Sequence, residues 1–124
     1  MPAPPPQSLR LPKDRHIKQS RDFARVRTQG KRMAKGCLTA NWLELPQGST
    51  SRVGVVTTRR IGSAVIRSRA RRLLREAFRL HQRELLPIDL VLVARQSIVG
   101  KSFAEVERDF IGVMKQGGVL KQAP

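Results

Sequence analysis

The stretch that decides the fold is RRIGSAVIRSRARRLLREAFRLHQR, residues 59–83, which contains nine arginines and a single acid, Glu76. Residues 67–83 contain no Gly or Pro and consist mostly of Leu, Ala, Arg and Gln, a composition that predicts a helix. At about 100° per residue the side chains separate onto two arcs, with Arg67 near the boundary between them. The apolar arc contains Ile66, Ala70, Leu73, Leu74, Ala77, Phe78 and Leu85, and the polar arc contains Arg69, Arg71, Arg72, Arg75, Arg79 and Arg83.

The polar arc repeats cations at a spacing of four residues, and each such pair costs roughly 0.2–0.5 kcal/mol in an isolated helix. Glu76 offsets part of this cost if it pairs with Arg72 and Arg79. A face that is merely solvated mixes both signs of charge, so this arc favours an interface with an anionic partner. Arginine outnumbers lysine by 18 to 7 in the chain. Because a guanidinium binds phosphate through two parallel hydrogen bonds, the arc predicts a phosphate-bearing partner.

Length and composition predict one globular domain, since 124 residues with 40% hydrophobic content suffice for a single core. The net charge of +16 indicates nucleic acid or an anionic membrane surface as the partner. No apolar run approaches the ~18 residues of a membrane span, and no apolar signal core is evident. The lone Cys37 excludes an internal disulfide and fits a reducing cytoplasm. We expect a disordered Pro-rich tail over residues 1–10, one domain over 11–116 and a flexible tail over 117–124.

A first helix and a first strand are expected before the basic stretch. Ser20 is the predicted N-cap of the helix, Asp22 falls in its first turn and Gly30 ends it. Residues 38–45 alternate as a strand does. One face of this strand presents Leu38, Ala40 and Trp42, and the other, more polar face presents Cys37, Thr39, Asn41 and Leu43.

The remaining elements follow from turn and capping signals. Residues 46–51, PQGSTS, are predicted to form a hairpin loop that leads into a second strand over residues 53–58. Residues 88–94 form a nearly continuous apolar run, which is typical of a central strand buried on both faces. Residues 102–105, SFAE, have the pattern of a capping box, and the helix that they open would end at the glycine pair 117–118. Its predicted core residues are Phe103, Val106, Phe110 and Val113.

The basic stretch contains the run Gly62-x-Ala64-Val65-x-Arg67-Ser68-Arg69-x-Arg71-Arg72-x-x-Arg75-Glu76-x-Phe78-Arg79. This run resembles the signature of the bacterial ribonuclease P protein subunit, with Ser68 where Asn is usual and Arg71 where Lys is usual. A serine hydroxyl replaces part of the hydrogen bonding of an asparagine. The resemblance covers residues 11–114 and includes the flanking matches Phe23-x-x-Val26-x-x-x-Gly30, Val53-Gly54 and Asp89-Leu90-Val91-Leu92-Val93-Ala94-Arg95.

The order strand, helix, strand across residues 53–94 predicts a crossover unit with two parallel strands. The general rule makes such crossovers right-handed. The resemblance implies the opposite hand: an α/β (α+β) two-layer sandwich, like domain 2 of ribosomal protein S5, with a left-handed βαβ crossover and three main helices.

A protein active site is not evident in the sequence. The nine acids form no D-x-D or E-x-x-H motif that would bind metal ions, and His16 and His81 have no evident partner. His81 falls on the apolar arc, where a core role is favoured over catalysis. The resemblance implies that the RNA subunit is the catalyst. It also implies that RNA mainly holds the Mg²⁺ that the holoenzyme requires, with no cofactor bound by protein side chains alone.

The resemblance assigns two ligand surfaces. The basic helix would bind the RNA subunit through Arg67, Ser68, Arg69, Arg71, Arg72, Arg75 and Arg79. A shallow cleft between the first helix and the sheet would bind the single-stranded 5′ leader of precursor tRNA through Phe23, Arg27, Asn41, Arg59, Arg60 and Arg95. Phe23 matches the cleft aromatic of the family, where stacking on a base contributes ~1–3 kcal/mol, although a core role is the alternative. Arg27 and Asn41 stand where aromatics are common, so this cleft would depend more on charge.

The function implied is that of the protein subunit of a cytoplasmic ribonuclease P, which removes the 5′ leader from precursor tRNA, with one protein per RNA. A non-enzymatic ribosomal or RNA-assembly protein is the main alternative, and the spaced signature at residues 62–79 favours the first interpretation. A membrane-surface protein is the weakest of the three, because the basic helix is expected to turn its apolar side to its own sheet.

Overall fold

The computed structural model describes residues 15–121, and the expected tail over residues 1–10 lies outside this range. Three α-helices and four strands form an α+β fold. In chain order the elements are α1 (Ser20–Gln29), β1 (Lys31–Lys35), β2 (Leu38–Glu44), β3 (Arg52–Val56), η3 (Arg59–Ile61), α2 (Ala64–His81), η4 (Gln82–Glu84), β4 (Ile88–Ala94), η5 (Gln96–Ile98) and α3 (Phe103–Gln116).

The strands lie in the order β1-β2-β4-β3. β3 and β4 are parallel, which confirms the predicted crossover unit, and the other neighbouring pairs are antiparallel. β4 is central and almost fully buried, as its apolar run predicts. The predicted hairpin at residues 46–51 is wrong, because β4 lies between β2 and β3 and this loop crosses the end of the sheet. The left hand of the crossover, implied by the resemblance, stays a prediction.

The hairpin of this sheet is formed instead by β1 and β2, which pair from Lys31 opposite Trp42 to Lys35 opposite Leu38. Its turn passes through Gly36 at φ 57°, a left-handed conformation that glycine adopts without a Cβ clash. No strand is expected at β1 from the sequence, because KRMAK has the composition of an exposed loop. Its burial pattern shows why: as an edge strand, β1 leaves three of its five side chains exposed.

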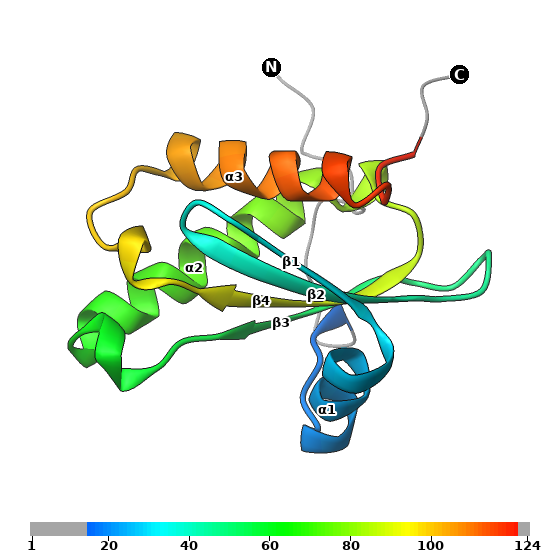
Figure 1. The fold of residues 1–124 in the computed structure, drawn as a ribbon, viewed down its shortest axis with the longest axis horizontal. Coiled ribbons are helices and arrows are strands. Elements are labelled where there is room, and N and C mark those ends of the chain that lie inside the picture. Colours follow the sequence, from blue (N-terminus) through cyan, green and yellow to red (C-terminus); the bar gives the residue numbers. More distant parts are fainter. Residues whose placement is uncertain (1–14, 122–124) are drawn as a thin grey trace, which may run out of the picture.

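Helices α2 and α3 cover one face of the sheet, and α1 lies on the opposite side (Figure 1). The main core lies between the sheet and α2 and α3 and contains the predicted inward face of β2, namely Leu38, Ala40 and Trp42. The predicted core positions Val106, Phe110 and Val113 of α3 are buried there, and Phe103 is partly buried against it. The sheet and the helices α2 and α3 form the two layers of the sandwich that the resemblance implies. α1 packs on the second face of the sheet.

The helix boundaries differ at three places from those expected, and one of them is the end of α2, which lies at His81 rather than at residue 83. α2 begins at Ala64, three residues before the predicted start, because the Ser63 hydroxyl caps it by accepting from the Ile66 N–H at 3.4 Å. The predicted N-cap role of Ser20 is wrong: Gln19 holds that position without a side-chain cap, and Ser20 is already helical. The capping box of Ser102 and Glu105 is confirmed, with both of its hydrogen bonds present.

Residues beyond the predicted domain boundary at residue 116 also pack against the core. Val119 is fully buried in the main core, and Leu120 forms a bridge to Leu85. Residues 117–121 are therefore not the flexible tail that the sequence analysis expected, while residues 122–124 lie outside the described range.

Candidate nucleic-acid interface

The seven residues assigned to the RNA subunit lie along the outer side of α2, and we call this set the arginine face. The buried side chains of the helix are Ala70, Leu74, Ala77 and Phe78, which confirms the centre of the predicted apolar arc. At its edges the prediction is less accurate, because Ile66 is 37% exposed and Leu85 lies beyond the end of α2. The arginine face consists of Arg67, Ser68, Arg69, Arg71, Arg72, Arg75 and Arg79. Because one side of α2 is anchored in the core, these cations are presented on a rigid element.

Four of the arginines on this face are held by other groups of the protein. Arg67 donates to the Gly62 carbonyl at 2.9 Å, and Arg69 donates to the Lys101 carbonyl at 2.9 Å. Arg79 forms an ion pair with Glu76, whose pKa is lowered mainly by the hydrogen bond from Arg79. These contacts fix the direction of each guanidinium before any ligand binds.

The fourth held arginine shows what Ser68 does in place of the usual asparagine. Arg71 donates to the Thr57 hydroxyl at 2.9 Å and to the Ser68 hydroxyl at 3.2 Å. Ser68 thus orients a neighbouring cation and leaves its own proton available to a ligand.

Arg72 and Arg75 differ from the others. Both are exposed, and within residues 15–121 neither has a hydrogen bond or an ion pair. The expected pair between Glu76 and Arg72 does not form, since the Glu76 carboxylate is bound to Arg79. These two guanidinium groups are therefore free to bind a phosphate at no cost in internal contacts.

The second face of the sheet forms a cleft with α1. One row of paired residues runs across it from Arg32 to Asn41, Val91 and Gly54. A Cβ on Gly54 would lie 2.5 Å from the Phe23 ring, so glycine at this position leaves room for the aromatic side chain. The missing side chain lets Phe23 lie close to the sheet.

The cleft contains two adjoining hollows. One, of about 210 Å³, is lined by Phe23, Arg27, Asn41, Val56, Val91 and Val93. The other, of about 300 Å³, is lined by Arg27, Arg32, Thr39, Asn41 and Val93. The fold thus brings three of the predicted leader-binding residues together: Phe23, Arg27 and Asn41. Phe23 lines the hollow and also packs on a small cluster with Ile17, Val26 and Val91, which confirms that it is partly a core residue. Its role in stacking on a base stays a prediction.

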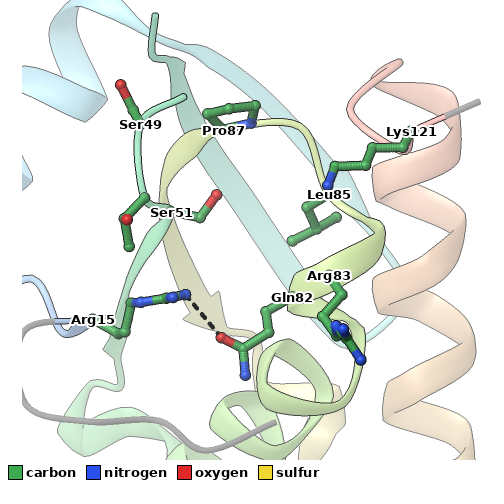
Figure 2. A pocket seen from close by; sticks show the side chains of 9 residues that line it. Arg15, Ser49, Ser51, Gln82, Arg83, Leu85, Pro87 and Lys121 are labelled. Atoms are coloured by element: carbon green, nitrogen blue, oxygen red, sulfur yellow. Dashed lines mark hydrogen bonds between the residues drawn. The ribbon is translucent and has the colours of Figure 1, made fainter. Parts of the chain in front are cut away.

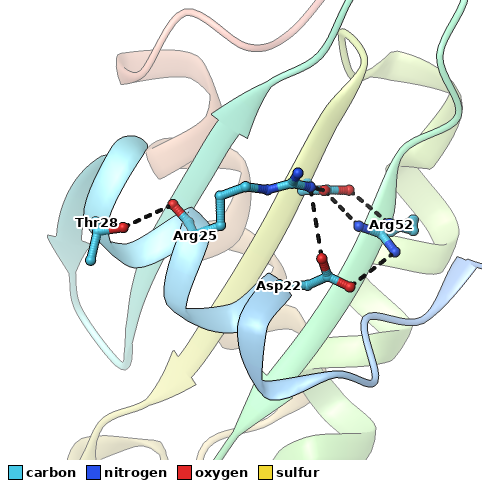
Figure 3. A network of polar contacts seen from close by, with 5 residues as sticks. Asp22, Arg25, Thr28 and Arg52 are labelled. Atoms are coloured by element: carbon cyan, nitrogen blue, oxygen red, sulfur yellow. Dashed lines mark hydrogen bonds and ion pairs between the residues drawn. The ribbon is translucent and has the colours of Figure 1, made fainter.

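A network of ion pairs sets the position of α1 over this face. Asp89 of β4 is 1% exposed and accepts from Arg52 of β3 at 3.0 and 2.8 Å and from Arg25 of α1 at 3.4 Å. Asp22 of α1 lies 3.7 Å from Arg52 (Figure 3). Two charges on the helix thus interlock with two on the sheet. The network fixes α1 against β3 and β4, and the two hollows open beside the helix.

The other three predicted cleft residues lie outside the hollows. Arg59 and Arg60 are exposed on η3, just after the end of β3, and Arg95 follows the end of β4. β3 and β4 are parallel, so all three lie at the same end of the sheet. Arg95 also donates to the Gly36 carbonyl at 3.3 Å, which ties it to the β1–β2 turn. These residues extend the cleft rather than line it.

Arg32 is a cleft residue that the sequence analysis missed. It lines the second hollow because it pairs directly with Asn41 across the β1–β2 hairpin. The missed signal was the alternation of K-R-M-A-K next to Gly36, which puts Met33 toward the core and Arg32 on the cleft side.

The family model described as Ribonuclease P matches residues 11–117 of the chain. The chain belongs to the ribonuclease P protein family. It is 32% identical over 115 residues to the ribonuclease P protein component of Listeria innocua, covering 92% of this chain and 97% of that protein. It is 37% identical over 111 residues to the same component from Syntrophomonas wolfei, covering 89% and 92%.

Solved structures of ribonuclease P proteins share the fold. The protein from Staphylococcus aureus superposes with a TM-score of 0.78 at 24% identity, covering 86% of this chain and 98% of that one. The protein from Thermotoga maritima superposes with a TM-score of 0.72 at 23% identity, covering 82% and 96%. In this family the protein is an accessory subunit of ribonuclease P, which cleaves tRNA precursors, and RNA carries out the catalysis.

Two titratable groups of this ribonuclease P protein lie away from both surfaces. No partner of His81 was evident from the sequence, but the structure provides two: His81 binds Glu84 and also Glu107, the latter at 2.8 Å. Burial works to lower the pKa of His81, but hydrogen bonds to Glu107 and Glu84 outweigh it and raise the pKa. Burial and the neighbouring Asp109 carboxylate raise the pKa of Cys37 to about 12, so the thiol stays protonated.

The described residues show neither a cluster of metal ligands nor a membrane-spanning helix. Within residues 15–121, no group of three or more His, Cys, Asp or Glu side chains is arranged to hold a metal ion. The same residues contain no helix of the length and apolar character needed to cross a membrane.

Proposed function

We propose that this subunit binds the ribonuclease P RNA through the arginine face and the single-stranded 5′ leader of precursor tRNA through the cleft. The observation that carries the first assignment is the pair of exposed, unpartnered guanidinium groups, Arg72 and Arg75, on a helix fixed in the core. Phosphates on an RNA surface would supply the counter-charges that the protein itself does not provide.

The cleft suits a single strand for a different reason. It presents one aromatic ring, Phe23, beside two cations, Arg27 and Arg32, so a base and its adjacent phosphates can bind together. Asn41 lines both hollows and adds a buried amide to the cleft. In this proposal the Mg²⁺ of the holoenzyme is held mainly by RNA, one protein binds one RNA, and the complex acts in the bacterial cytoplasm.

The deciding experiment compares Arg72→Ala and Arg75→Ala with the parent in binding the RNA subunit. A hydrogen bond to a charged group contributes roughly 1.5–3 kcal/mol, so each change should weaken binding about ten-fold or more. Stability against urea should stay the same or rise slightly, because neither side chain has a partner within residues 15–121 and Arg75→Ala removes two like-charge pairs. Lys115→Ala, which removes an exposed cation from α3, is the matched control. Equal RNA affinity of the Arg72, Arg75 and Lys115 variants would refute the assignment of the arginine face.

A second experiment tests the cleft with precursors of graded leader length across a salt series. Arg27→Ala should weaken binding of long leaders and lower the salt slope by about 0.7, the value for one phosphate contact on a single strand. Phe23→Ala should weaken binding without a change in slope, because it removes stacking and no charge. Mature tRNA should bind both variants as it binds the parent. Normal binding of every leader length by both variants would place the leader elsewhere.

A further inference from the structure

A further basic concavity lies beside the C-terminal end of α2, where Gln82 donates to the carbonyl of Arg79, the last residue of the arginine face. It has a volume of about 190 Å³, and we call it the basic pocket; its lining includes Arg15, Ser49, Thr50, Gln82, Arg83 and Lys121 (Figure 2). It is at the start of β4, next to Pro87, whereas Arg59, Arg60 and Arg95 lie beyond the other end of that strand. Seven residues of β4 span roughly 20 Å, so the pocket is separate from these three arginines at the far end of the cleft.

Four segments that are distant in the sequence build the pocket. Arg15 donates to the side-chain oxygen of Gln82 at 3.0 Å, and Gln82 is itself only 6% exposed. Lys121 is held in place because its backbone N–H donates to the Glu84 carbonyl at 2.7 Å. On the loop between β2 and β3, the Ser51 hydroxyl accepts from the Ile88 N–H at 3.0 Å, which ties residues 49–51 to the start of β4. The cations and hydroxyls are thus positioned by the fold.

Among residues 15–121, the charges that line the pocket are of one sign: three are cations and none is a carboxylate. Glu84, which follows Arg83 in the chain, is bound to His81 on the neighbouring turn. Within residues 15–121, the side chains of Arg83 and Lys121 have no hydrogen bond or ion pair, and neither do the hydroxyls of Ser49 and Thr50. The pocket therefore combines unpaired positive charge with free hydroxyl donors.

We propose that the basic pocket binds one phosphate group, supplied by an RNA backbone outside the arginine face and the cleft. Its volume equals about six water molecules at roughly 30 Å³ each, which is room for a phosphate with part of its hydration. A guanidinium, an ammonium and hydroxyls together match the several acceptor oxygens of a phosphodiester. That the phosphate belongs to RNA rests on the proposed function, whereas the affinity of the pocket for phosphate does not.

The first test uses inorganic phosphate and the full chain. Amide resonances of residues 49–51 should shift with a saturable dependence on phosphate at constant ionic strength. Lys121→Gln and Arg83→Gln should each weaken this response at least three-fold, whereas Lys115→Gln, which removes an exposed lysine outside the pocket, should not. Shifts at residues 49–51 that do not saturate, or that are equal in all three variants, would overturn the phosphate site.

The second test identifies the source of the phosphate with the same variants in the reconstituted holoenzyme. Loss of affinity for the RNA subunit, with a salt slope smaller by roughly 0.7–0.9, assigns the phosphate to that RNA. The same loss confined to precursor tRNA assigns it to the substrate. Unchanged affinity for both RNAs, with a saturable response to inorganic phosphate, overturns the RNA source and leaves a site for free phosphate. None of these results depends on the Arg72 and Arg75 variants, so the two proposals fail independently.

Discussion

At the scale of single residues, the fold depends on places where the absence of a side chain lets the backbone approach closely. Gly30 joins α1 to β1, and a Cβ there would lie 2.2 Å from the Trp42 carbonyl oxygen and 2.5 Å from that of Val26. Its φ of −91° is open to any residue, so glycine is needed for space alone. Gly112 of α3 is different, because its nearest neighbour is the flexible end of the Lys35 side chain at 2.8 Å.

Gly30→Ala should therefore destabilise the protein by about 1–3 kcal/mol, the usual cost of forcing atoms into a packed site. Gly112→Ala should be neutral or stabilising by up to about 1 kcal/mol, because Lys35 can move aside and alanine favours the helix. Urea unfolding followed by circular dichroism measures both. Similar midpoints for the two variants would show that the contact at Gly30 relaxes without strain.

Also at the scale of a single residue, Asp89 is the centre of the network that positions α1. Asp89→Asn keeps the shape but removes the charge that Arg25 and Arg52 share. We expect a loss of about 1–3 kcal/mol, below the roughly 3–5 kcal/mol of a fully buried pair, because these arginines are 45% and 29% exposed. Binding of long-leader precursors should also weaken, since the cleft depends on the position of α1. Glu44→Gln, which breaks an exposed pair with Lys31, is the control and should change neither quantity.

At the scale of elements, α2 and α3 are joined by a titratable contact. His81 at the end of α2 binds Glu84 of η4 and Glu107 of α3, and its ring lies 6.2 Å from that of Phe110. The raised pKa means that the folded state holds the proton more tightly than the unfolded chain does. Its stabilisation is therefore complete below the ordinary pKa of 6.5 and disappears as the pH rises through the raised pKa.

The stability difference between the parent and His81→Gln should follow this dependence. It should be largest below about pH 6.5 and shrink as the solution becomes alkaline. Urea titrations at a series of pH values measure it, and Glu107→Gln should flatten the parent's profile. A difference that grows with pH would mean that His81 is buried neutral rather than held as a cation.

At the scale of the whole molecule, the carboxylates within residues 15–121 are used for structure. Asp22, Glu76 and Asp89 are all bound to arginines, and Glu84 and Glu107 are bound to His81. The excess positive charge is left on surfaces that face outward. This division of charge fits an accessory subunit that binds RNA while RNA carries out the catalysis.

The purified protein should accordingly leave precursor tRNA intact at every Mg²⁺ concentration, and addition of a ribonuclease P RNA should restore removal of the leader. Gel analysis of the 5′ end is the measurement. Metal-dependent cleavage at the mature 5′ end by RNA-free protein would contradict the accessory role.

Local patterns in the sequence were enough for several features of this molecule. The apolar arc of α2, the capping box at Ser102 and the burial of β4 all depend on the spacing of neighbouring residues, which the sequence shows directly. The signature at residues 62–79 led to the family for the same reason. The sets of residues assigned to the two RNA surfaces stay proposals.

The tertiary structure decided what depends on long-range pairing. The insertion of β4 between β2 and β3 excludes the predicted hairpin, and the pairing of Arg32 with Asn41 adds a cation to the cleft. Which arginines of α2 are free depends on carbonyls and hydroxyls from other segments, such as Thr57. The basic pocket needs residues 15, 49–51, 82–87 and 121 together. Hydrophobic periodicity specifies which side of an element is buried, but strand order and register arise from the packing of the whole chain, so no local pattern contains them.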